Sequence, residues 1–473
     1  MRIVVVGAGI AGLAAAYVLR DHDVTVVDGA RQIGGKLRTS EVGGVAVDEG
    51  AEAFVLRAPE GKALAEAVGL GDRLTVPATS SASLVVRGRV RPLPSGTLLG
   101  VPTEVEPIRA TFGDAAADAV AYEPSLGGEP LTGDVAVGEL VRTRLGPDIA
   151  DGLVDPLLGG VYAGRADQLS LRATMPAVAA RLAEDPSLVR AATAAIVAAK
   201  SDEPVFGTVV DGMGALPRAV LEASGASLRL GLPVREISRH GDGFRLVAGP
   251  VPDPTVLEAD GVVVAVPAAK AAPMLRDVAP WAAHELAAID YASLAIVTLV
   301  YPSAPLPDGS GLLVPATEDR NDSLEASRPG LGTFAVKALT FSSQKWAHVG
   351  ASGRTVVRAS IGRYGEEQVL HRDDPDLVAA AVRDVAELTG LTAPPIASRV
   401  TRWGGGLPQY AVGHPDRVRR IRDAVARVPG LAVAGAAYDG VGIPACIRSG
   451  EAAATVVLSG LGADRGDLRE SKV

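Results

Sequence analysis

The residue types that most often carry catalysis are few in this chain, and they are scattered. Its six histidines form no pair at the i, i+3 or i, i+4 spacing of a helical metal site, and Cys446 is its only cysteine. Neither a GxSxG elbow nor a GxxxxGK[ST] phosphate loop occurs in the sequence. These residues therefore predict an enzyme without a metal, whose chemistry is supplied by a bound cofactor.

Glycines near the N-terminus have the spacing of a turn that binds such a cofactor. Gly7, Gly9 and Gly12 follow a β-branched run at 3–6 and precede a helical pattern at 13–20. A second predicted strand, at 24–27, is followed directly by Asp28, at the usual reach to a ribose hydroxyl pair. A charge-free run behind a basic residue also fits an export signal, but the order strand, turn, helix, strand and acid favours a dinucleotide site.

Two further glycine clusters indicate an extended ligand. The segment "GARQIGGKLRTS" pairs Gly34 with Gly35 and adds Lys36, and Gly50 follows in "VDEGAEAF". A third cluster, at 435–442, lies between a short predicted strand and a helix expected from about Arg448. A nicotinamide domain does not need the second glycine pair, so the pattern favours a flavin; an ordinary glycine-rich hairpin at 37–47 is the alternative.

Length and composition bound the kind of protein. At 473 residues the chain exceeds one core, so two or three domains are expected. Its 46 basic and 55 acidic residues give a net charge of -9, which argues against nucleic acid as a partner. The single cysteine excludes an intrachain disulfide and favours a cytoplasmic protein. Beyond the N-terminal run, no charge-free apolar stretch approaches the roughly 20 residues of a spanning helix, so no transmembrane segment is expected.

Five segments together carry a resemblance to a known family. They are "LPSGTLLGVPT" at 93–103, "DPLLGGVYAGRADQLSL" at 155–171, "FGTVVDGMGALPRAV" at 206–220, "RWGGGLPQYAVGH" at 402–414 and "YDGVGIPACIRSG" at 438–450. With the N-terminal motif, the chain resembles the FAD-dependent protoporphyrinogen and coproporphyrinogen oxidases of the amine oxidase-like flavoprotein superfamily. The resemblance implies an α/β fold with a discontinuous Rossmann-like FAD domain, a mixed-sheet substrate domain and a mainly helical domain. The implied ranges are 1–57, 205–272 and 405–465 for FAD, 58–95 and 273–404 for substrate, 96–204 for the helical domain and 466–473 for a tail.

The resemblance also implies which residues hold FAD. The diphosphate would lie on the N-terminal glycine turn, the adenosine ribose at Asp28, adenine at the Val234 backbone, and the flavin end at the C-terminal glycine loop. Two residues depart from the family pattern, Gln32 in place of Arg and Ala445 in place of an acid. The implied cofactor residues are Gly7, Ala8, Gly9, Ile10, Ala11, Gly12, Asp28, Gly35, Lys36, Gly50, Ala51, Glu52, Ala53, Val234, Trp403, Val441, Gly442 and Ile443.

The function implied by the resemblance is FAD-dependent oxidation of coproporphyrinogen III to coproporphyrin III in haem biosynthesis. Six electrons would leave in three hydride transfers, with O2 as acceptor and H2O2 as product, so no strong protein acid or base is needed. The cysteine-poor, Arg-biased composition resembles that of the bacterial members of the coproporphyrin pathway. This resemblance favours coproporphyrinogen III over protoporphyrinogen IX as the substrate. Two further functions fit the same fold: an amine or carotenoid-type oxidase, and a flavin-free escort or GDP-dissociation-like protein. Expected partners are the porphyrinogen, O2 and, transiently, a ferrochelatase or another haem-pathway enzyme, with a peripheral membrane contact at the helical domain.

Three further features of the sequence, an arginine hairpin, a lysine and the cysteine, each have two interpretations. Arg87, Arg89 and Arg91 alternate in "VVRGRVRPLP" and would share one strand face, either as a binding site for substrate propionates or as a solvated hairpin face. Lys345 is either a lysine beside the flavin or a surface lysine whose stem covers Trp346. Cys446 is either a covalent flavin anchor or a small packed thiol, and its motif favours the thiol.

Overall fold

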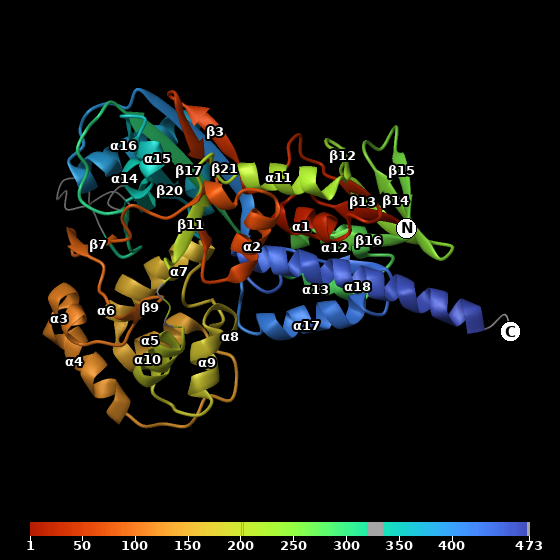
Figure 1. Cartoon of the computed structure of the whole chain (residues 1–473). Coiled ribbons are helices and arrows are strands. Elements are labelled where there is room, and N and C mark those ends of the chain that lie inside the picture. Colours follow the sequence, from red (N-terminus) through yellow and green to blue (C-terminus); the bar gives the residue numbers. More distant parts are fainter. Residues whose placement is uncertain (200, 202, 319–333, 471–473) are drawn as a thin grey trace.

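The structure, a computed structural model, describes residues 1–199, 201, 203–318 and 334–470. Figure 1 shows a sheet and its covering helices at one end of the molecule, a second, larger sheet at the other end, and a group of helices below the larger sheet. These three parts confirm the predicted fold class, α/β with a Rossmann-like parallel sheet, a mixed sheet and a helical region.

The first sheet is parallel and is assembled from three distant segments of the chain. Its β-branched strands are buried on both faces, which is typical of parallel sheets covered by helices. On the central strand β1 the side chains alternate, with Ile3 and Val5 facing α1 (Ile10–Val18) and α18 (Ile443–Glu470). The spatial order is β12 (Ser227–Arg229), β2 (Asp23–Val27), β1 (Arg2–Val6), β16 (Gly261–Val264) and β22 (Leu431–Val433).

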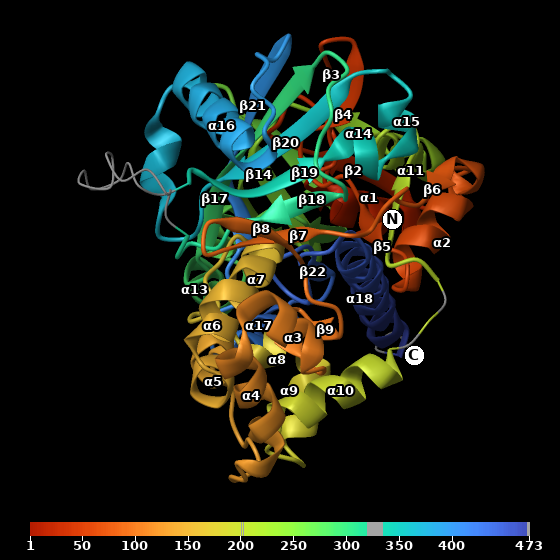
Figure 2. The same ribbon diagram turned by 90° about the vertical axis from the view of Figure 1, so that its left-hand side faces the viewer.

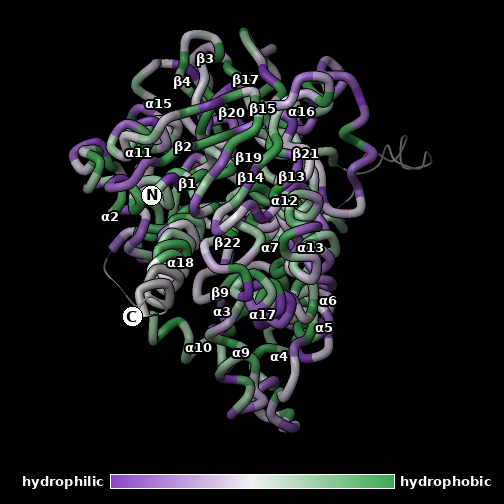
Figure 3. The backbone as a smooth tube through the Cα atoms, turned by 90° about the vertical axis from the view of Figure 1, so that its right-hand side faces the viewer, coloured by the Kyte–Doolittle hydropathy of each residue, from purple (hydrophilic) through white to green (hydrophobic). Residues whose placement is uncertain are grey.

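Helices and a small antiparallel sheet cover the opposite face of this parallel sheet, where Val4 and Val6 point. One of them, α17 (His414–Val425), is mostly hydrophilic, purple in Figure 3, and buries only the side chains that face the sheet and its neighbours. The other elements on this side are α12 (Ala268–Leu275), α13 (Pro280–Ala287), β13 (Val234–His240), β14 (Gly243–Ala248) and β15 (Thr255–Ala259).

The second sheet has seven strands, antiparallel except where β18 meets β7. One face packs on α16 (Asp374–Thr389) through Leu377, Ala381 and Val385, and this forms a separate core. The order is β21 (Ala397–Pro408), β17 (Tyr291–Tyr301), β20 (Thr355–Ile361), β19 (Val336–Phe341), β18 (Gly311–Leu313), β7 (Ser83–Val86) and β8 (Arg89–Pro92).

The helical region lies below this sheet in Figure 2, and α7 packs on β18 and β19. Its core is lined by Leu, Val, Ile and Ala side chains of short helices joined by glycine and proline turns. The helices are α3 (Glu106–Phe112), α4 (Asp114–Tyr122), α5 (Val137–Leu145), α6 (Pro147–Ile149), α7 (Asp155–Tyr162), α8 (Leu171–Thr174), α9 (Pro176–Leu182) and α10 (Leu188–Ala198).

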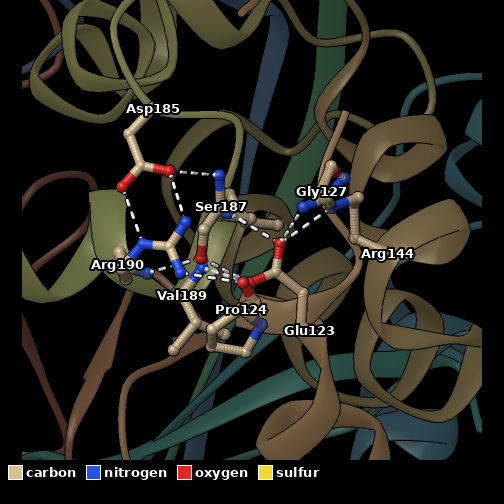
Figure 4. A network of polar contacts seen from close by, with 9 residues as sticks. Glu123, Pro124, Gly127, Arg144, Asp185, Ser187, Val189 and Arg190 are labelled. Carbon is tan, nitrogen blue, oxygen red and sulfur yellow. Dashed lines mark hydrogen bonds and ion pairs between the residues drawn. The ribbon is translucent and has the colours of Figure 1, made fainter. Parts of the chain in front are cut away.

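A buried carboxylate ties this helical region together. Glu123 is fully buried, and Figure 4 shows donors surrounding it. Arg144 Nε donates to it at 2.8 Å, Ser187 Oγ at 2.7 Å, and the N–H groups of Leu188 and Val189 at 2.8 and 3.2 Å. Burial by itself would raise the pKa of Glu123, but the bonds from Ser187, Leu188 and Arg144 lower it overall. Glu123 thus holds the start of α10 against α5.

The predicted domain ranges remain a prediction, and several of their limits fall inside elements. The limit at 272/273 lies within α12 and that at 404/405 within β21, which continues through its glycines to Pro408. α13 packs with α12 and α17, although it lies in the range predicted for the substrate domain. The predicted tail at 466–473 begins inside α18, and its last three residues lie outside the described residues.

Candidate functional site

The glycine turn between β1 and α1 is shaped as the sequence predicts. A Cβ on Gly12 would lie 2.0 Å from the Gly7 carbonyl oxygen, so only glycine lets the helix pass this close to the strand. Gly7 itself has a φ of +117°. By contrast, a Cβ on Gly9 would meet nothing within 4 Å, which leaves open space in front of the turn.

The start of α1 suits an anion. Gly9 occupies the N-cap, no side chain caps the helix, and no acidic residue lies in its first turn. The first-turn N–H groups of a helix have no partner within the helix, so here they are available to a phosphate, which the helix dipole also favours. The turn therefore fits the diphosphate of a dinucleotide, as predicted for 7–12.

Asp28 lies directly after β2 and beside this turn. Its two carboxylate oxygens accept the N–H groups of Ala8 and Ala30, each at 2.7 Å. These bonds fix the carboxylate next to the glycine turn, and each oxygen keeps a lone pair for a further donor. The predicted bond to a ribose hydroxyl remains a prediction that this position allows.

The second glycine pair packs against the first turn. Gly34 N–H donates to Ala8 O at 2.8 Å, and Gly34 forms a parallel bridge with Gly9. Gly35 adopts a φ of +59°, and a Cβ on it would lie 3.4 Å from Gly9 Cα. Lys36 follows at once, and burial lowers the pKa of its ammonium. The two glycine clusters thus form one continuous surface.

The loop at 50–53 is held by close contacts on both sides. A Cβ on Gly50 would lie 2.1 Å from Lys36 O and 3.1 Å from Trp403 Cζ2. Trp403 Nε1 donates to Glu49 O at 2.9 Å, which fixes the indole beside the loop. Trp403 comes from β21, so the larger sheet and the N-terminal loop meet here. The structure thereby brings Trp403 beside Lys36 and Gly50, two predicted positions that lie more than 350 residues before it along the chain.

Glu52, in the same loop, is the centre of a buried ionic cluster. It pairs with Lys345 Nζ at 2.6 Å and with Arg358 Nη1, while Arg358 Nη2 donates to Gly50 O. Burial by itself would raise the pKa of Glu52, but Lys345 and Arg358 lower it to about 2. The two cations therefore clamp the loop to β20 and to α14 (Ser342–Lys345).

Lys345 was considered as a site residue from the sequence, whereas Arg358 was not. Lys345 is not a surface lysine, because its ammonium is bound to the predicted cofactor loop and lies 5.1 Å from the Trp346 ring centroid. Arg358 is missed by sequence reasoning, although it is the one charged residue in the apolar strand "TVVRASI". A lone charge in a buried strand is the signal that could have found it.

A small polar cavity lies behind this loop. It holds about 20 Å³, room for one water, and Asp48, Glu52 and Arg358 line it. In the part of the chain that the structure describes, the buried atoms Ser342 Oγ, Trp346 Nε1 and His348 Nδ1 of the same lining have no hydrogen-bond partner. Burial raises the pKa of Asp48 to about 6.

The C-terminal glycine loop reaches the same place. α18 begins at Ile443, five residues before the expected Arg448, because Pro444 is tolerated in a first helical turn, where its missing N–H is not needed. Val441 and Gly442 therefore lie directly before the helix start. A Cβ on Gly450 would be 2.0 Å from Ala11 O, so α18 crosses α1 in close contact, as Figure 1 shows. Both ends of the chain thus build one site.

Cys446 lies in the first turns of α18 and is buried. Burial raises the pKa of its thiol to about 11, although the Lys36 ammonium opposes this shift. A protonated thiol is a poor nucleophile, which fits the packed-thiol interpretation. Val234 is buried at the start of β13 in the core that includes Val6 and Val27, near the ends of the parallel strands. Its contact with adenine remains a prediction.

The prediction for the arginine hairpin is wrong in part. Arg87 lies in the turn between β7 and β8, with a φ of +52°, and so does not share a strand face with Arg89 and Arg91. The N–H groups of Arg87 and Gly88 donate to the Glu318 carboxylate at 2.7 and 2.8 Å, which bends the chain here. β8 is exposed along its whole length, so the solvated hairpin face is the better interpretation.

Comparison with known proteins decides the family. The model of the family described as flavin containing amine oxidoreductase matches residues 10–458. The chain belongs to this family. It is a flavin-dependent oxidoreductase with FAD as its cofactor, which leaves the flavin-free alternative without support. Among the described residues, no group of three or more His, Cys, Asp or Glu could hold a metal ion.

Relatives of this flavin-containing amine oxidoreductase extend over its whole length. The coproporphyrinogen III oxidase of Mycobacterium tuberculosis is 35% identical, covering 97% of this chain and 98% of the relative. That of Bacillus subtilis is 29% identical, covering 97% and 98%. A crystal structure from Exiguobacterium sp., described as "Putative protoporphyrinogen oxidase", has a TM-score of 0.82 and 32% identity, covering 97% and 99%. Cyclohexylamine oxidase from Brevibacterium oxydans shares the fold, with a TM-score of 0.71 at 17% identity and coverage of 98% and 99%. No helix within the described residues is long and apolar enough to cross a membrane.

Proposed function

We propose that this protein oxidises coproporphyrinogen III to coproporphyrin III, a reaction of haem biosynthesis. The observation that carries the proposal is the full-length similarity to several bacterial proteins named coproporphyrinogen III oxidase. The site agrees with this chemistry, because it combines a flavin cradle with a buried Cys446 thiol whose pKa is raised to about 11 and which is therefore a poor nucleophile.

The chemistry requires positioning more than proton transfer by the protein. The porphyrinogen becomes aromatic as six electrons and six hydrogens leave it, so the driving force lies in the substrate. Bound FAD supplies the electron acceptor, three times per macrocycle, and O2 is the terminal oxidant, giving H2O2. The protein must hold a bridging carbon of the macrocycle in reach of the cofactor and keep the site dry.

Each part of the chain has a proposed task. The turn at 7–12 binds the diphosphate with first-turn N–H groups, and Asp28 accepts a bond from the ribose. The loop at 50–53, clamped by Arg358 and Lys345, and Trp403 lie along the cofactor toward its flavin end, where 441–443 meet it. Gly35 and Lys36 continue the diphosphate surface, and the Val234 backbone binds adenine.

We also propose a cytoplasmic location, with a transient contact to a ferrochelatase or another haem-pathway enzyme that takes the product. A peripheral membrane contact would use the helical region. The proposed transfer follows from the reaction, because a free porphyrin is its product and a direct transfer would limit loss of that porphyrin.

The first test follows oxygen and porphyrin together. The holoenzyme is supplied with coproporphyrinogen III, and coproporphyrin fluorescence, O2 uptake and H2O2 formation are recorded. About three O2 consumed and three H2O2 formed for each coproporphyrin would support the proposal. Porphyrin formation no faster than in a flavin-free control would overturn it.

Protoporphyrinogen IX is the second candidate substrate. A chloroplastic protoporphyrinogen oxidase of Nicotiana tabacum is 27% identical over 94% of this chain and 83% of the relative. The two substrates differ in carboxylate number, four against two, so a comparison of kcat/KM separates them. A value at least tenfold higher for coproporphyrinogen III is expected, and the reverse order would favour the second candidate.

A further inference from the structure

Lys337 is a buried cation that forms no ion pair with any residue the structure describes. It lies in β19, and only 6% of its surface is exposed. Within the part of the chain that the structure describes, no hydrogen bond or ion pair reaches its ammonium. Buried ammonium groups are normally paired, because an unpaired one is costly, so an unpartnered lysine at this depth needs an explanation.

The surroundings of Lys337 are also short of negative charge. Arg363 is 11% exposed and donates through Nη2 to Val314 O at 2.7 Å, and Val314 N–H in turn donates to Lys337 O at 2.9 Å. Arg165 pairs with Glu366 at 2.9 Å and lies 3.7 Å from Asp155. Arg363 also pairs with Glu366, at 3.7 Å, so two guanidinium groups already share the one carboxylate that acts on Lys337.

This cluster lies where the helical region meets the seven-stranded sheet. α7 packs on β18 and β19, and Tyr364 N–H donates to Ala163 O at 2.8 Å across the junction. A cavity of about 430 Å³ opens at the same junction, lined among others by Tyr364, Gln409 and Leu169. The strand that carries Gln409 continues to Tyr410, whose hydroxyl donates to Ala436 O in the C-terminal glycine loop. The cavity lies beside the cluster at Tyr364, the residue after Arg363, and its lining includes neither Lys337 nor Arg363.

We propose that Lys337 and Arg363 form a carboxylate-binding site that holds one propionate of the porphyrinogen. The inference rests on the proposed function, since it assigns a part of that substrate to a place in this chain. A carboxylate between an ammonium and a guanidinium would supply the missing charge and the missing hydrogen-bond acceptor. The Glu52 cluster cannot serve in the same way, because its two cations already share a carboxylate.

The protonation of Lys337 supports this assignment. Burial, with a smaller contribution from Arg363, lowers the pKa of Lys337 to about 7, although Glu366 opposes this shift. A carboxylate bound beside it would raise this pKa and keep the ammonium charged. Binding should therefore weaken as the pH rises above 7, because the free protein must take up a proton to bind.

The test compares Lys337→Met, Lys337→Arg and the control Lys270→Met, which changes an exposed lysine of α12. Coproporphyrin III is titrated into each holoenzyme, and its fluorescence gives Kd. Lys337→Met should weaken binding about tenfold or more and raise KM for coproporphyrinogen III with little change in kcat. Lys270→Met should match the wild type. A change below twofold for Lys337→Met would overturn the proposal.

A pH profile adds a readout that a merely structural role would not move. Between about pH 7 and pH 8.5 the wild-type Kd should rise about tenfold, whereas Lys337→Arg, which keeps its charge, should stay nearly constant. Arg363 and Glu366, the charged groups that act on Lys337, are the same in both proteins, so the difference between the profiles reports Lys337. Equal profiles would contradict the proposal.

Failure of this site and failure of the proposed function can be told apart. If Lys337→Met binds coproporphyrin normally while the wild type oxidises coproporphyrinogen III, only the site is wrong. If the wild type oxidises no porphyrinogen, the proposed function is wrong. A Lys337→Met protein that does not fold would also overturn the inference, because it would mean that the fold itself uses this charge.

Discussion

Glu123 and Lys337 are both buried charges, and their surroundings differ. Glu123 receives bonds from Arg144, Ser187 and two backbone N–H groups, so its position is fully determined by the protein. Lys337 is buried nearly as deeply, yet no described group pairs with it. A buried charge with a structural role has its hydrogen-bond and ion-pair partners within the protein. A buried charge that binds a ligand lacks such a partner until the ligand is present.

The Glu52 cluster stands between these two cases. Its carboxylate is paired with Lys345 and Arg358, so it is satisfied like Glu123, but it belongs to the loop predicted to follow FAD. Its ionic bonds therefore stabilise the fold and position the cofactor loop at once. The surroundings of Glu123, Glu52 and Lys337 therefore predict three different changes in stability when one charged side chain of each is replaced.

Glu123→Ala should have the largest effect. It leaves Arg144 partly buried without its carboxylate and removes the acceptor for three other donors, so we expect the free energy of unfolding to fall by about 3–5 kcal/mol. Urea denaturation measures this, with Glu184→Ala, an exposed glutamate of the same region, as the control. A loss below about 1 kcal/mol would contradict the view that Glu123 joins the helices.

Arg358→Met should come next. It leaves Glu52 with one partner and frees Gly50 O, so we expect a loss of about 2–4 kcal/mol together with weaker retention of FAD on gel filtration. Arg354→Met, at an exposed position just before β20, serves as the control. The double variant Glu52→Gln, Arg358→Met should lose less than the sum of the single changes. Strict additivity would show that the pair does not act as a unit.

Lys337→Met should raise the free energy of unfolding, in contrast to the two variants above. Replacing an unpaired buried ammonium by an apolar side chain of similar length should raise the free energy of unfolding at pH 7 by about 1–3 kcal/mol. The folded pKa of Lys337, about 7, lies below the unfolded value, so the cost of the lysine is present in full below pH 7 and fades as the pH rises toward the unfolded pKa. The gain should therefore shrink by pH 10. Destabilisation by this variant would remove the contrast with Glu123.

Cys446→Ala should change least. The thiol is buried, uncharged at neutral pH and not part of the proposed chemistry, so the loss of stability should be about 1 kcal/mol, and turnover should remain within about twofold. Acid precipitation should release FAD from the wild type and the variant alike. FAD that stays with the wild-type protein and leaves the variant would instead identify Cys446 as a covalent anchor.

Sequence patterns over a few residues predicted those parts of the fold that are set by contacts between nearby residues. The turn at Gly7, Gly9 and Gly12 needs glycine for steric reasons that spacing alone reveals, and the structure shows those close contacts. The early start of α18 was missed, because glycines before Pro444 look like a loop when tertiary packing is unknown. The alternating arginines at 87, 89 and 91 predicted a shared strand face, but Arg87 lies in a turn, which local alternation does not show.

The ionic clusters lay beyond sequence reasoning. Glu52 lies 293 residues before Lys345 and 306 residues before Arg358, and only the folded structure places the three together. Lys337, like Arg358, is the one charged residue of an apolar strand, and this pattern marks the position without showing which groups surround it. Its meaning comes from burial and from the lack of a partner, which only three-dimensional packing defines.

The most direct test of the central claim is the visible spectrum of the oxygen-free holoenzyme as coproporphyrinogen III is added. The account predicts rapid loss of the oxidised flavin band at about 450 nm with this substrate and slower loss with protoporphyrinogen IX. A yellow protein whose band neither compound bleaches would contradict the proposed reaction.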